Sequence, residues 1–391
     1  MITFEDAFKI VQDAVYYEMS TERISLNESL NRILAKDIVS DINMPPFPKS
    51  AMDGYACRYE DLKNEWEVLE VIAAGKLPEK PIGKNQCSKI MTGAMMPEGA
   101  DCVIKVEESE ELSNGKVRFT ATDTKRNFML MGEDVKVNDL VLKKGSLLNA
   151  QHIAMAAAVG YDNPRVFKKV RVGVISTGDE LVEPHIMPGP SQIRNSNAYQ
   201  LLAQLQNMNV TPLYFGIARD TEESTTKVVV KAIDDCDVIL LTGGVSMGDF
   251  DFVPKIFDQL GVEIKFKEIA LQPGKPTVFG VLKNKFIFGL PGNPVSSYNI
   301  FEILTKPLIY KMMGYDYKPV EIRLPMGKTY TRKSSSRKSF LPIKIKNGKI
   351  WPIDYHGSAH IFALTEANGW ISIPIGVSAI NEGEIVDVRQ I

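Results

Sequence analysis

The sequence has few cysteines and no excess of basic residues. Its four cysteines, Cys57, Cys87, Cys102 and Cys236, are scattered without a C-x-x-C pair, so they match neither the spacing of a zinc site nor that of a disulfide framework. This cysteine usage favours a reducing compartment. Lysine and arginine number 46 against 48 aspartates and glutamates, whereas a nucleic-acid-binding domain is typically strongly basic. We therefore expect no nucleic-acid partner, and any anionic ligand must be held by a local site.

Long apolar runs are also missing. No stretch approaches the roughly 18 apolar residues that span a bilayer, and residues 1–6 lack the basic and apolar regions of a secretory signal. We expect a cytoplasmic protein without a membrane partner. The chain has 391 residues, of which 44% are hydrophobic and 24% are charged. At about 150 residues per domain, this ordinary globular composition predicts two to four domains, each with its own core.

The first part of the chain predicts a helix followed by a β-rich segment. Apolar residues recur there at helical spacing: Phe4, Ala7, Phe8, Val11 and Val15. Thr3 precedes them, and its hydroxyl can cap the helix, with Asp6 three residues further on. Pro45, Pro46 and Pro48 then forbid a helix. Short strand-like runs, broken by glycine and proline, follow up to about residue 135, and a second helix is expected over 150–159.

From Val170 to about Met313 the pattern changes to alternating strands and helices. Strands are expected over 170–176, 213–218 and 238–242, and helices over 198–208, 222–233 and 253–260. This alternation is typical of βαβ units in a doubly wound parallel sheet. The apolar run at 238–241 fits a central strand that is buried on both faces. Beyond Lys318, strand candidates at 340–345, 370–373 and 385–388 predict a small terminal β domain.

In open α/β sheets, ligands bind beyond the carboxyl ends of the strands. Three strand ends here carry small residues and carboxylates: S-T-G-D-E-L at 176–181, Arg219-Asp220, and G-G-V-S-M-G-D-F-D at 243–251. Gly243 and Gly244 allow backbone N–H groups to approach an oxyanion, and the Ser246 hydroxyl adds a donor. We therefore expect a phosphate cradle at this edge of the sheet.

Three aspartates near that cradle predict a divalent cation. Asp220, Asp249 and Asp251 would repel a phosphate unless a hard cation lay between them, and Mg²⁺ characteristically bridges carboxylates and phosphate oxygens. In the alternative, structural interpretation, the glycines form a tight turn and the aspartates cap the helix that starts near Asp251. Because three strand ends converge, the ligand site is the favoured interpretation.

Two proline-rich loops flank the last strands of this sheet, L-Q-P-G-K-P at 271–276 and L-P-G-N-P-V-S at 290–296. Asn293-Pro294 should begin a helix whose N-terminal amides favour anions, and Lys275 can supply a cation. Three further motifs place a carboxylate or hydroxyl beside glycine in the β-rich segment: S-A-M-D-G-Y-A at 50–56, M-T-G-A at 91–94 and G-E-D at 132–134. Each of these three is, by itself, an ordinary turn.

In this order, the motifs closely resemble those of the molybdopterin molybdotransferase family, which includes the MoeA-type enzymes and the C-terminal domain of gephyrin. The resemblance covers nearly the whole chain. Its most specific pieces are SAMDGYA at 50–56, STGDEL at 176–181, GGVSMGDFD at 243–251, PGKP at 273–276 and LPGNPVS at 290–296. GGVSMGD and PGNP alone are also similar to the smaller molybdopterin adenylyltransferases.

The resemblance implies an α/β multidomain fold. Its parts would be an elongated helical linker domain (1–45 plus 136–168), an inserted β-rich domain (46–135), a doubly wound parallel-sheet molybdopterin-binding domain (169–317) and a C-terminal β-barrel-like domain (318–391). It also implies an elongated homodimer whose active site lies between the α/β domain of one subunit and the insertion of the other.

The implied activity is insertion of molybdate into adenylated molybdopterin, with Mg²⁺-dependent release of AMP, in molybdenum cofactor biosynthesis. A molybdopterin adenylyltransferase is a candidate partner. The resemblance and the residue patterns together assign three groups of site residues. The catalytic group is Asp53, Thr92, Asp134, Glu180, Asp220 and Asp251. The substrate-binding group is Gly243, Gly244, Ser246, Lys267, Lys275, Pro291, Pro294, Arg337 and Ser358, and the metal-binding group is Asp220, Asp249 and Asp251.

Roles for these residues follow from charge. Molybdate is a small dianion, so cations and hydroxyl donors suit it: Lys267, Lys275, Arg337 and Ser358. Asp220 and Asp251 suit Mg²⁺ on the substrate's phosphates. Asp53 and Asp134 would orient substrate or water from the partner subunit. None of them is assigned as a general base, because a sequence does not report a pKa.

The chain departs from the family pattern at two positions. Many relatives have arginine where this chain has Met129, within N-x-R-x-x-G-E-D, and many bacterial members have a second lysine where it has Gln272. Both changes remove a cation. His356 and His360 have the i, i+4 spacing of helical metal ligands, but Gly357-Ser358 between them predicts a loop.

Two alternatives to the transferase stay open. A pterin-binding scaffold without catalysis, serving protein interaction, would be consistent with the two lost cations. An adenylyltransferase acting on molybdopterin would account for the βαβ domain but leave the insertion and the terminal domain without a purpose. The sequence also leaves open whether the oxyanion is molybdate or tungstate, and which of the carboxylates bind the metal.

Overall fold

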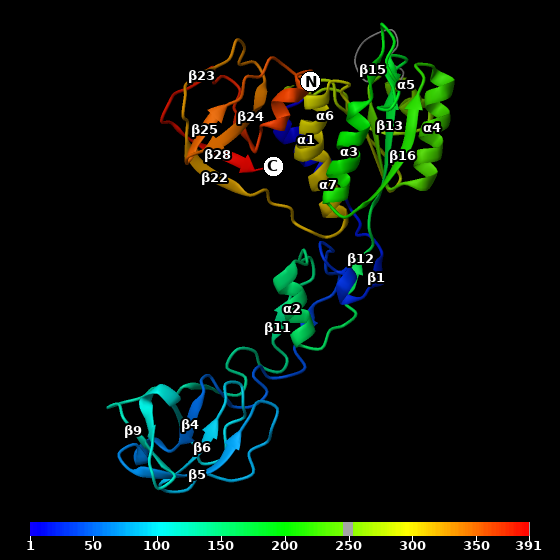
Figure 1. The fold of residues 1–391 in the computed structure, drawn as a ribbon. Helices are drawn as coiled ribbons and strands as arrows, with labels where there is room; N and C mark the ends of the chain where they lie inside the picture. The colour runs from blue at the N-terminus through cyan, green and yellow to red at the C-terminus, as the bar shows by residue number, and fades with distance from the viewer. Residues whose placement is uncertain (245–252, 391) are drawn as a thin grey trace.

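The computed structural model describes residues 1–244 and 253–390. The molecule is elongated and bent (Figure 1). An α/β part and a C-terminal β part lie side by side at one end, a β-rich insertion forms the other end, and a narrow linker joins them. Every helix within the described ranges is too short or too polar to span a bilayer.

The linker is built from two stretches of chain that are far apart in the sequence. Its elements are β1 Thr21–Arg23, the 3₁₀ turn Leu26–Glu28, β2 Ile38–Val39, β11 Leu140–Leu142, α2 Ala150–Ala158 and β12 Arg165–Phe167. β1 pairs with β12, and β2 pairs with β11, both antiparallel. Asn149 caps α2, because its side chain accepts from the His152 N–H while the His152 ring meets the Asn149 N–H. The predicted second helix is therefore confirmed.

The insertion is β-rich, as predicted. Its six-stranded sheet has the order β7-β4-β6-β5-β9-β8. The elements are β3 Lys49–Ser50, β4 Gly54–Cys57, the 3₁₀ turn Tyr59–Asp61, β5 Glu65–Ile72, β6 Gln86–Ile90, β7 Cys102–Lys105, the 3₁₀ turn Val106–Glu108, β8 Ser109–Glu111, β9 Lys116–Phe119 and β10 Phe128–Met129. Neighbouring residues of β4 enter different cores: Tyr55 packs with Trp66, whereas Ala56 packs with Ile72. Both faces of the sheet are therefore covered, as the period of two in a strand allows.

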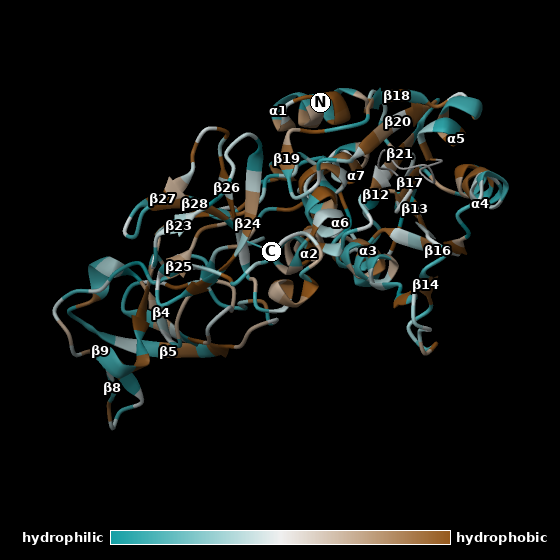
Figure 2. Cartoon of the chain, turned by 90° about the horizontal axis from the view of Figure 1, so that it is seen from above, coloured by the Kyte–Doolittle hydropathy of each residue, from teal (hydrophilic) through white to brown (hydrophobic). Residues whose placement is uncertain are grey.

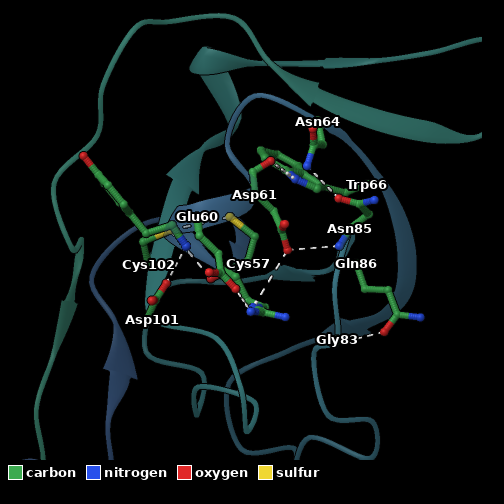
Figure 3. Close-up of polar contacts among 12 residues, drawn as sticks. Cys57, Glu60, Asp61, Asn64, Trp66, Gly83, Asn85, Gln86, Asp101 and Cys102 are labelled. Carbon is green, nitrogen blue, oxygen red and sulfur yellow. Dashed lines mark hydrogen bonds and ion pairs between the residues drawn. The ribbon is translucent and has the colours of Figure 1, made fainter.

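One of these cores contains a buried pair of thiols (Figure 3). Cys57 of β4 lies opposite Cys102 of β7, with their Sγ atoms 3.5 Å apart. The nearby turn is fixed by Asp61, whose backbone oxygen accepts from Trp66 Nε1 at 2.9 Å and whose carboxylate accepts from the Asn85 N–H at 3.0 Å. All four cysteines of the chain are buried and carry free thiols.

The α/β part has a six-stranded sheet in the order β16-β13-β17-β21-β20-β18. Its strands are β13 Arg171–Thr177, β16 Thr211–Ala218, β17 Val238–Thr242, β18 Glu263–Phe266, β20 Val278–Leu282 and β21 Lys285–Leu290, and a small separate pair is formed by β14 Leu181–Val182 and β15 Ile193–Arg194. Its helices are α3 Ser196–Asn207, α4 Glu222–Asp235, α5 Val253–Gln259, α6 Pro294–Ile300, the π-helical turn Phe301–Thr305 and α7 Lys306–Met312.

The predicted parallel arrangement holds for four of these strands. β16, β13, β17 and β21 are parallel neighbours, whereas β20 and β18 extend the sheet antiparallel. The reason for the change is the two-residue connection 283–284 between β20 and β21, because a tight turn can join only antiparallel strands.

Both faces of this sheet are covered by helices, as the apolar run at 238–241 predicted. Val238 and Leu240 belong to the core that includes Leu201 of α3, whereas Ile239 and Leu241 belong to the core on the opposite face. α4 covers that opposite face and shows both polar and apolar colour in Figure 2, as a helix with one face on a sheet should.

The first helix, α1 Phe4–Asp13, begins at Thr3, whose Oγ1 accepts from the Asp6 N–H at 3.0 Å, as predicted. The predicted linker domain included it, but α1 packs elsewhere. Its buried residues Ala7 and Val11 join the core of the α/β part, and Lys338 of the C-terminal part pairs with Glu5 at 2.7 Å. An amphipathic helix packs where its apolar face is buried, whatever its position in the sequence.

The C-terminal part consists of a larger, mostly antiparallel sheet and a separate antiparallel pair of strands. Its strands are β22 Glu321–Pro325, β23 Tyr330–Thr331, β24 Lys338–Lys346, β25 Lys349–Pro352, β26 Gly369–Ile373, β27 Ala379–Ile380 and β28 Ile385–Gln390, and Ile361–Thr365 forms a 3₁₀ turn. β19 Leu271–Gln272 leaves the α/β part and pairs parallel with the start of β24. This pairing joins the two parts at the loop that carries the predicted cations.

Candidate active site

The carboxyl ends of β13 and β16 are locked together by two aspartates. The Asp179 N–H donates to Asp220 Oδ2 at 3.2 Å, and the Asp220 N–H donates to Asp179 Oδ1 at 3.3 Å. This exchange is possible because β13 and β16 are parallel neighbours and end at the same edge. Asp179 therefore joins Asp220 at this edge, where Asp220 was the one described residue that the sequence predicted as a metal ligand. The sequence signal that could have identified Asp179 was its position directly after Gly178 at the end of a strand.

The glycine turn after β17 lies beside this pair. Gly243 has a φ of +92° and its N–H donates to the Leu290 oxygen at 3.1 Å. A Cβ placed on Gly243 would be 2.5 Å from the Thr177 oxygen, so no side chain fits there. Gly244, which follows, also has a positive φ of +63°. Neither glycine places a side chain of its own at this edge, as a backbone cradle for a phosphate requires.

Part of the predicted site lies outside the described residues. Ser246, Asp249 and Asp251 fall within 245–252, so only Asp220 of the predicted metal ligands is described. Residues 1–244 and 253–390 contain no group of three or more acidic, histidine or cysteine side chains arranged to hold a metal. The Asp179–Asp220 pair supplies the oxygen ligands that suit Mg²⁺, which in phosphate sites takes one or two carboxylates and keeps several waters.

Glu180 is exposed at the same edge, and its carboxylate folds back over Gly178. A Cβ on Gly178 would be 2.4 Å from Glu180 Oε2. The backbone oxygen of Glu180 accepts from the Ile193 N–H at 2.8 Å. This contact fixes the loop between β13 and α3, so the Glu180 side chain stays next to Asp179.

The loop 290–296 brings the C-terminal part to the α/β part. Asn293 Nδ2 donates to Ser358 Oγ at 2.9 Å, and the Val295 N–H donates to the Ser358 oxygen at 3.1 Å. Ser358 therefore meets the loop of Pro291 and Pro294. One amide of the predicted anion-binding helix start is already used by this contact.

The predicted cations cluster around β19. Arg337 Nη1 donates to the Leu271 oxygen at 3.3 Å. Lys275 Nζ lies 3.2 Å from Glu268 Oε1, and Lys267 is exposed. Gln272 lies between them on β19 and is exposed too. The β19–β24 pairing thus gathers cations from two parts of the chain, which the sequence alone could not place together.

In the insertion, Asp53 and Thr92 form a tight pair. Asp53 Oδ1 accepts from the Thr92 N–H at 2.6 Å and from Thr92 Oγ1 at 2.7 Å. The backbone hydrogen bond, and then the hydroxyl, lower the pKa of Asp53 below its ordinary value. Asp134 is exposed, and its N–H donates to the Met44 oxygen at 2.9 Å.

One chain does not bring the two groups together. Asp53, Thr92 and Asp134 belong to the insertion, whereas Asp220, Gly243 and the cations belong to the opposite end of the molecule (Figure 1). Each end therefore carries half of the predicted site.

His356 and His360 lie in a loop, as Gly357-Ser358 predicted. Their rings stack with centroids 5.1 Å apart, and His356 Nε2 lies 3.3 Å from Asp354 Oδ2. The spacing of the two histidines therefore does not report helical metal ligands.

Comparison with known proteins accounts for the whole chain. Residues 2–160 match the MoeA N-terminal region (domain I and II), residues 173–311 match a family described as a probable molybdopterin binding domain, and residues 327–391 match the MoeA C-terminal region (domain IV). The chain is similar to a molybdopterin molybdenumtransferase of Staphylococcus epidermidis, with 35% identity over 402 residues, 99% of this chain and 95% of that protein.

Two further similarities cover most or all of the chain. A molybdopterin molybdenumtransferase of Staphylococcus aureus strain COL is 33% identical over 93% of this chain and 90% of its own length. Among solved structures, the molybdopterin biosynthesis moeA protein of Pyrococcus horikoshii OT3 superposes with a TM-score of 0.87 and 28% identity over the full length of both chains.

Proposed function

We propose that this chain, which belongs to the family of molybdopterin molybdenumtransferases, inserts molybdate into adenylated molybdopterin and releases AMP in a Mg²⁺-dependent step. The observation that carries the proposal is the Asp179–Asp220 pair beside the Gly243 turn. Carboxylates next to a bare backbone cradle suit a magnesium-bound phosphate better than a neutral ligand.

Each group of residues has a task in this proposal. Asp220 and Asp179 would hold Mg²⁺, which supplies positive charge to the phosphate oxygens when bound. In the turn after β17 the Gly243 N–H is already bonded to the Leu290 oxygen, so Gly244 would present its N–H group to the same phosphates. Lys267, Lys275, Arg337 and Ser358 would bind molybdate, because a dianion is held by cations and hydroxyl donors. The contact of Asn293 with Ser358 supports a place for Ser358 at the loop 290–296.

We further propose a homodimer in which the insertion of one subunit completes the site of the other. The separation of the two half sites within one chain supports this arrangement. Asp53 is held ionised by Thr92, so it would orient a substrate group that donates a hydrogen bond, or a cation. Adenylated molybdopterin would be supplied by an adenylyltransferase, because the substrate already carries the AMP that is released.

The test is an anaerobic incubation of the purified protein with adenylated molybdopterin, Mg²⁺ and molybdate. AMP release and reconstitution of an apo-molybdoenzyme are scored against a reaction without molybdate. We expect both signals to depend on molybdate. A folded protein that binds the pterin but releases no AMP would instead favour the scaffold, and ATP-dependent adenylation of molybdopterin would favour an adenylyltransferase.

A further inference from the structure

A lysine of the insertion lies between the two segments that carry its predicted site residues. Lys49 is on β3, opposite Met129 of β10 on one side and bridged to Met95 on the other. Thr92 is three residues before Met95, and Asp134 is five residues after Met129. The short strand of Lys49 therefore lies at the centre of this half of the site.

A pocket of about 270 Å³ opens beside Lys49 at the junction of the insertion and the linker. Lys49 and Asp134 are its charged groups, and Met44, Pro45 and Met129 provide apolar wall. A water molecule takes up about 30 Å³ of liquid volume, so the pocket has room for a tetrahedral oxyanion with several waters. The apolar wall lowers the local polarity, which strengthens any charge interaction inside the pocket.

The ammonium group of Lys49 has no carboxylate partner within the described ranges 1–244 and 253–390, although Asp134 lines the same pocket. Two other lysines of the insertion do have carboxylate partners, Lys89 with Glu111 at 3.1 Å and Lys105 with Glu108 at 3.5 Å. Lys49 is also half-buried. A half-buried cation without a counter-ion is stabilised when an anion binds next to it.

We propose that Lys49 binds an oxyanion of the transferase substrates, either molybdate or the adenylyl phosphate. This inference rests on the proposed function and adds a substrate-binding residue to it. Of the predicted site residues in the insertion, Asp53 and Asp134 are anionic and Thr92 is neutral. Without Lys49 this half of the site would therefore repel both substrates. Lys49 supplies the compensating positive charge on the insertion's side.

A footprint on the unmodified protein tests the contact directly. The purified full-length protein is acylated at its lysines with and without molybdate, and with and without AMP, and the extent of acylation at Lys49 is read by mass spectrometry. Lys84, an exposed lysine of the insertion outside the pocket, serves as the internal control. We expect at least one ligand to protect Lys49 severalfold and to leave Lys84 unchanged. The ligand that protects identifies the oxyanion.

Kinetics of three variants then test the role in the reaction. Lys49→Gln removes the charge, Lys49→Arg retains it, and Lys84→Gln makes the matched charge change outside the pocket. The molybdate concentration is varied at saturating adenylated molybdopterin, and the concentration of adenylated molybdopterin is then varied at saturating molybdate. We expect Lys49→Gln to raise one KM by about tenfold or more, as loss of a charge-assisted hydrogen bond does, with kcat little changed. Lys49→Arg should restore most of that loss.

Two results would overturn the inference. One is equal acylation of Lys49 with and without saturating molybdate and AMP. The other is a Lys49→Gln variant whose two KM values match those of the unmodified protein. The footprint needs no turnover, so failure of the unmodified protein to release AMP would count against the proposed function while the acylation comparison still decides the role of Lys49.

Discussion

Asp179 and Asp220 each donate a backbone N–H to the carboxylate of the other, at 3.2 and 3.3 Å. The two residues are 41 positions apart in the sequence and follow neighbouring parallel strands. Their exchange fixes both loops at the carboxyl edge of the sheet and holds each carboxylate on the backbone of the other residue. This relationship, more than any single motif, supports the proposal that a magnesium-bound phosphate binds at this edge.

Replacing the Asp220 carboxylate should weaken the binding of Mg²⁺ at the proposed site. Asp220→Asn keeps an oxygen that can accept from the Asp179 N–H, so the loops should stay locked while one negative charge is lost. We expect AMP release to fall by about 100-fold and the Mg²⁺ concentration for half-maximal rate to rise. The measurement is the rate against Mg²⁺ concentration. Asp258→Asn, an exposed carboxylate on α5, is the control, and an unchanged magnesium requirement in Asp220→Asn would contradict the role.

Removing the Thr92 hydroxyl should raise the pKa of Asp53 part of the way to its ordinary value. The backbone N–H of Thr92 is the larger cause of the lowered pKa and remains in Thr92→Val, whereas the hydroxyl is lost. Because the folded pKa is lowered, the contact stabilises the insertion at neutral pH, and this contribution is lost as the pH falls through the folded pKa. NMR titration of the Asp53 carboxyl measures the shift, and Thr92→Ser should leave it in place. A titration identical in Thr92→Val and the unmodified protein would refute the contact.

The turn after β17 should not tolerate a side chain. In Gly243→Ala the new Cβ would lie 2.5 Å from the Thr177 oxygen at a φ of +92°, so we expect a loss of about 2 kcal/mol or more in the free energy of unfolding. Gly115→Ala separates the two causes, because Gly115 has a φ of +76° but nothing within 4 Å of its Cβ. It should cost only about 1 kcal/mol. Urea unfolding measures the free energy of unfolding of both variants. Equal losses of that free energy would show that the close approach to Thr177 does not matter.

The thiols should be unreactive until the protein unfolds. Burial raises the pKa of Cys87 to about 12 and that of Cys236 to about 11. The hydrogen bond with Cys102, followed by burial, also raises the pKa of Cys57. A thiolate is the reactive form, so a chromogenic aromatic disulfide reagent should label few thiols at pH 8 and four in denaturant.

The same pKa shifts predict a loss of stability in base. A thiol whose pKa is raised by folding contributes its full stability below its ordinary pKa of 9.0, and that contribution falls as the pH rises toward the folded value. Unfolding in urea at pH 8 and pH 10 measures it, and Cys87→Ser should reduce the difference. Rapid labelling of four thiols in the native protein would show that the cysteines are accessible.

Local patterns predicted most elements of the fold. The helix capped by Thr3, the buried strand at 238–241 and the change to a β-rich segment after Pro48 could all be read from spacing, because hydrophobic period and proline act on the chain within a few residues. The motifs also indicated which loops would carry the site. The direction of β20 was not predicted, because it depends on the two-residue turn between β20 and β21, which lies in a region without a strong turn motif.

Tertiary structure decided which of these residues meet. The sequence by itself determined the carboxylates, glycines and cations and the order in which they occur. It could not place Ser358 on Asn293, Arg337 on Leu271 or Lys49 in a pocket with Asp134, because each contact joins segments that are far apart in the chain. Packing of whole parts against each other, through β19 on β24 and α1 on the α/β core, brings these side chains together. The sequence determines the type of each residue, whereas the folded structure fixes the distances between the side chains that form a site.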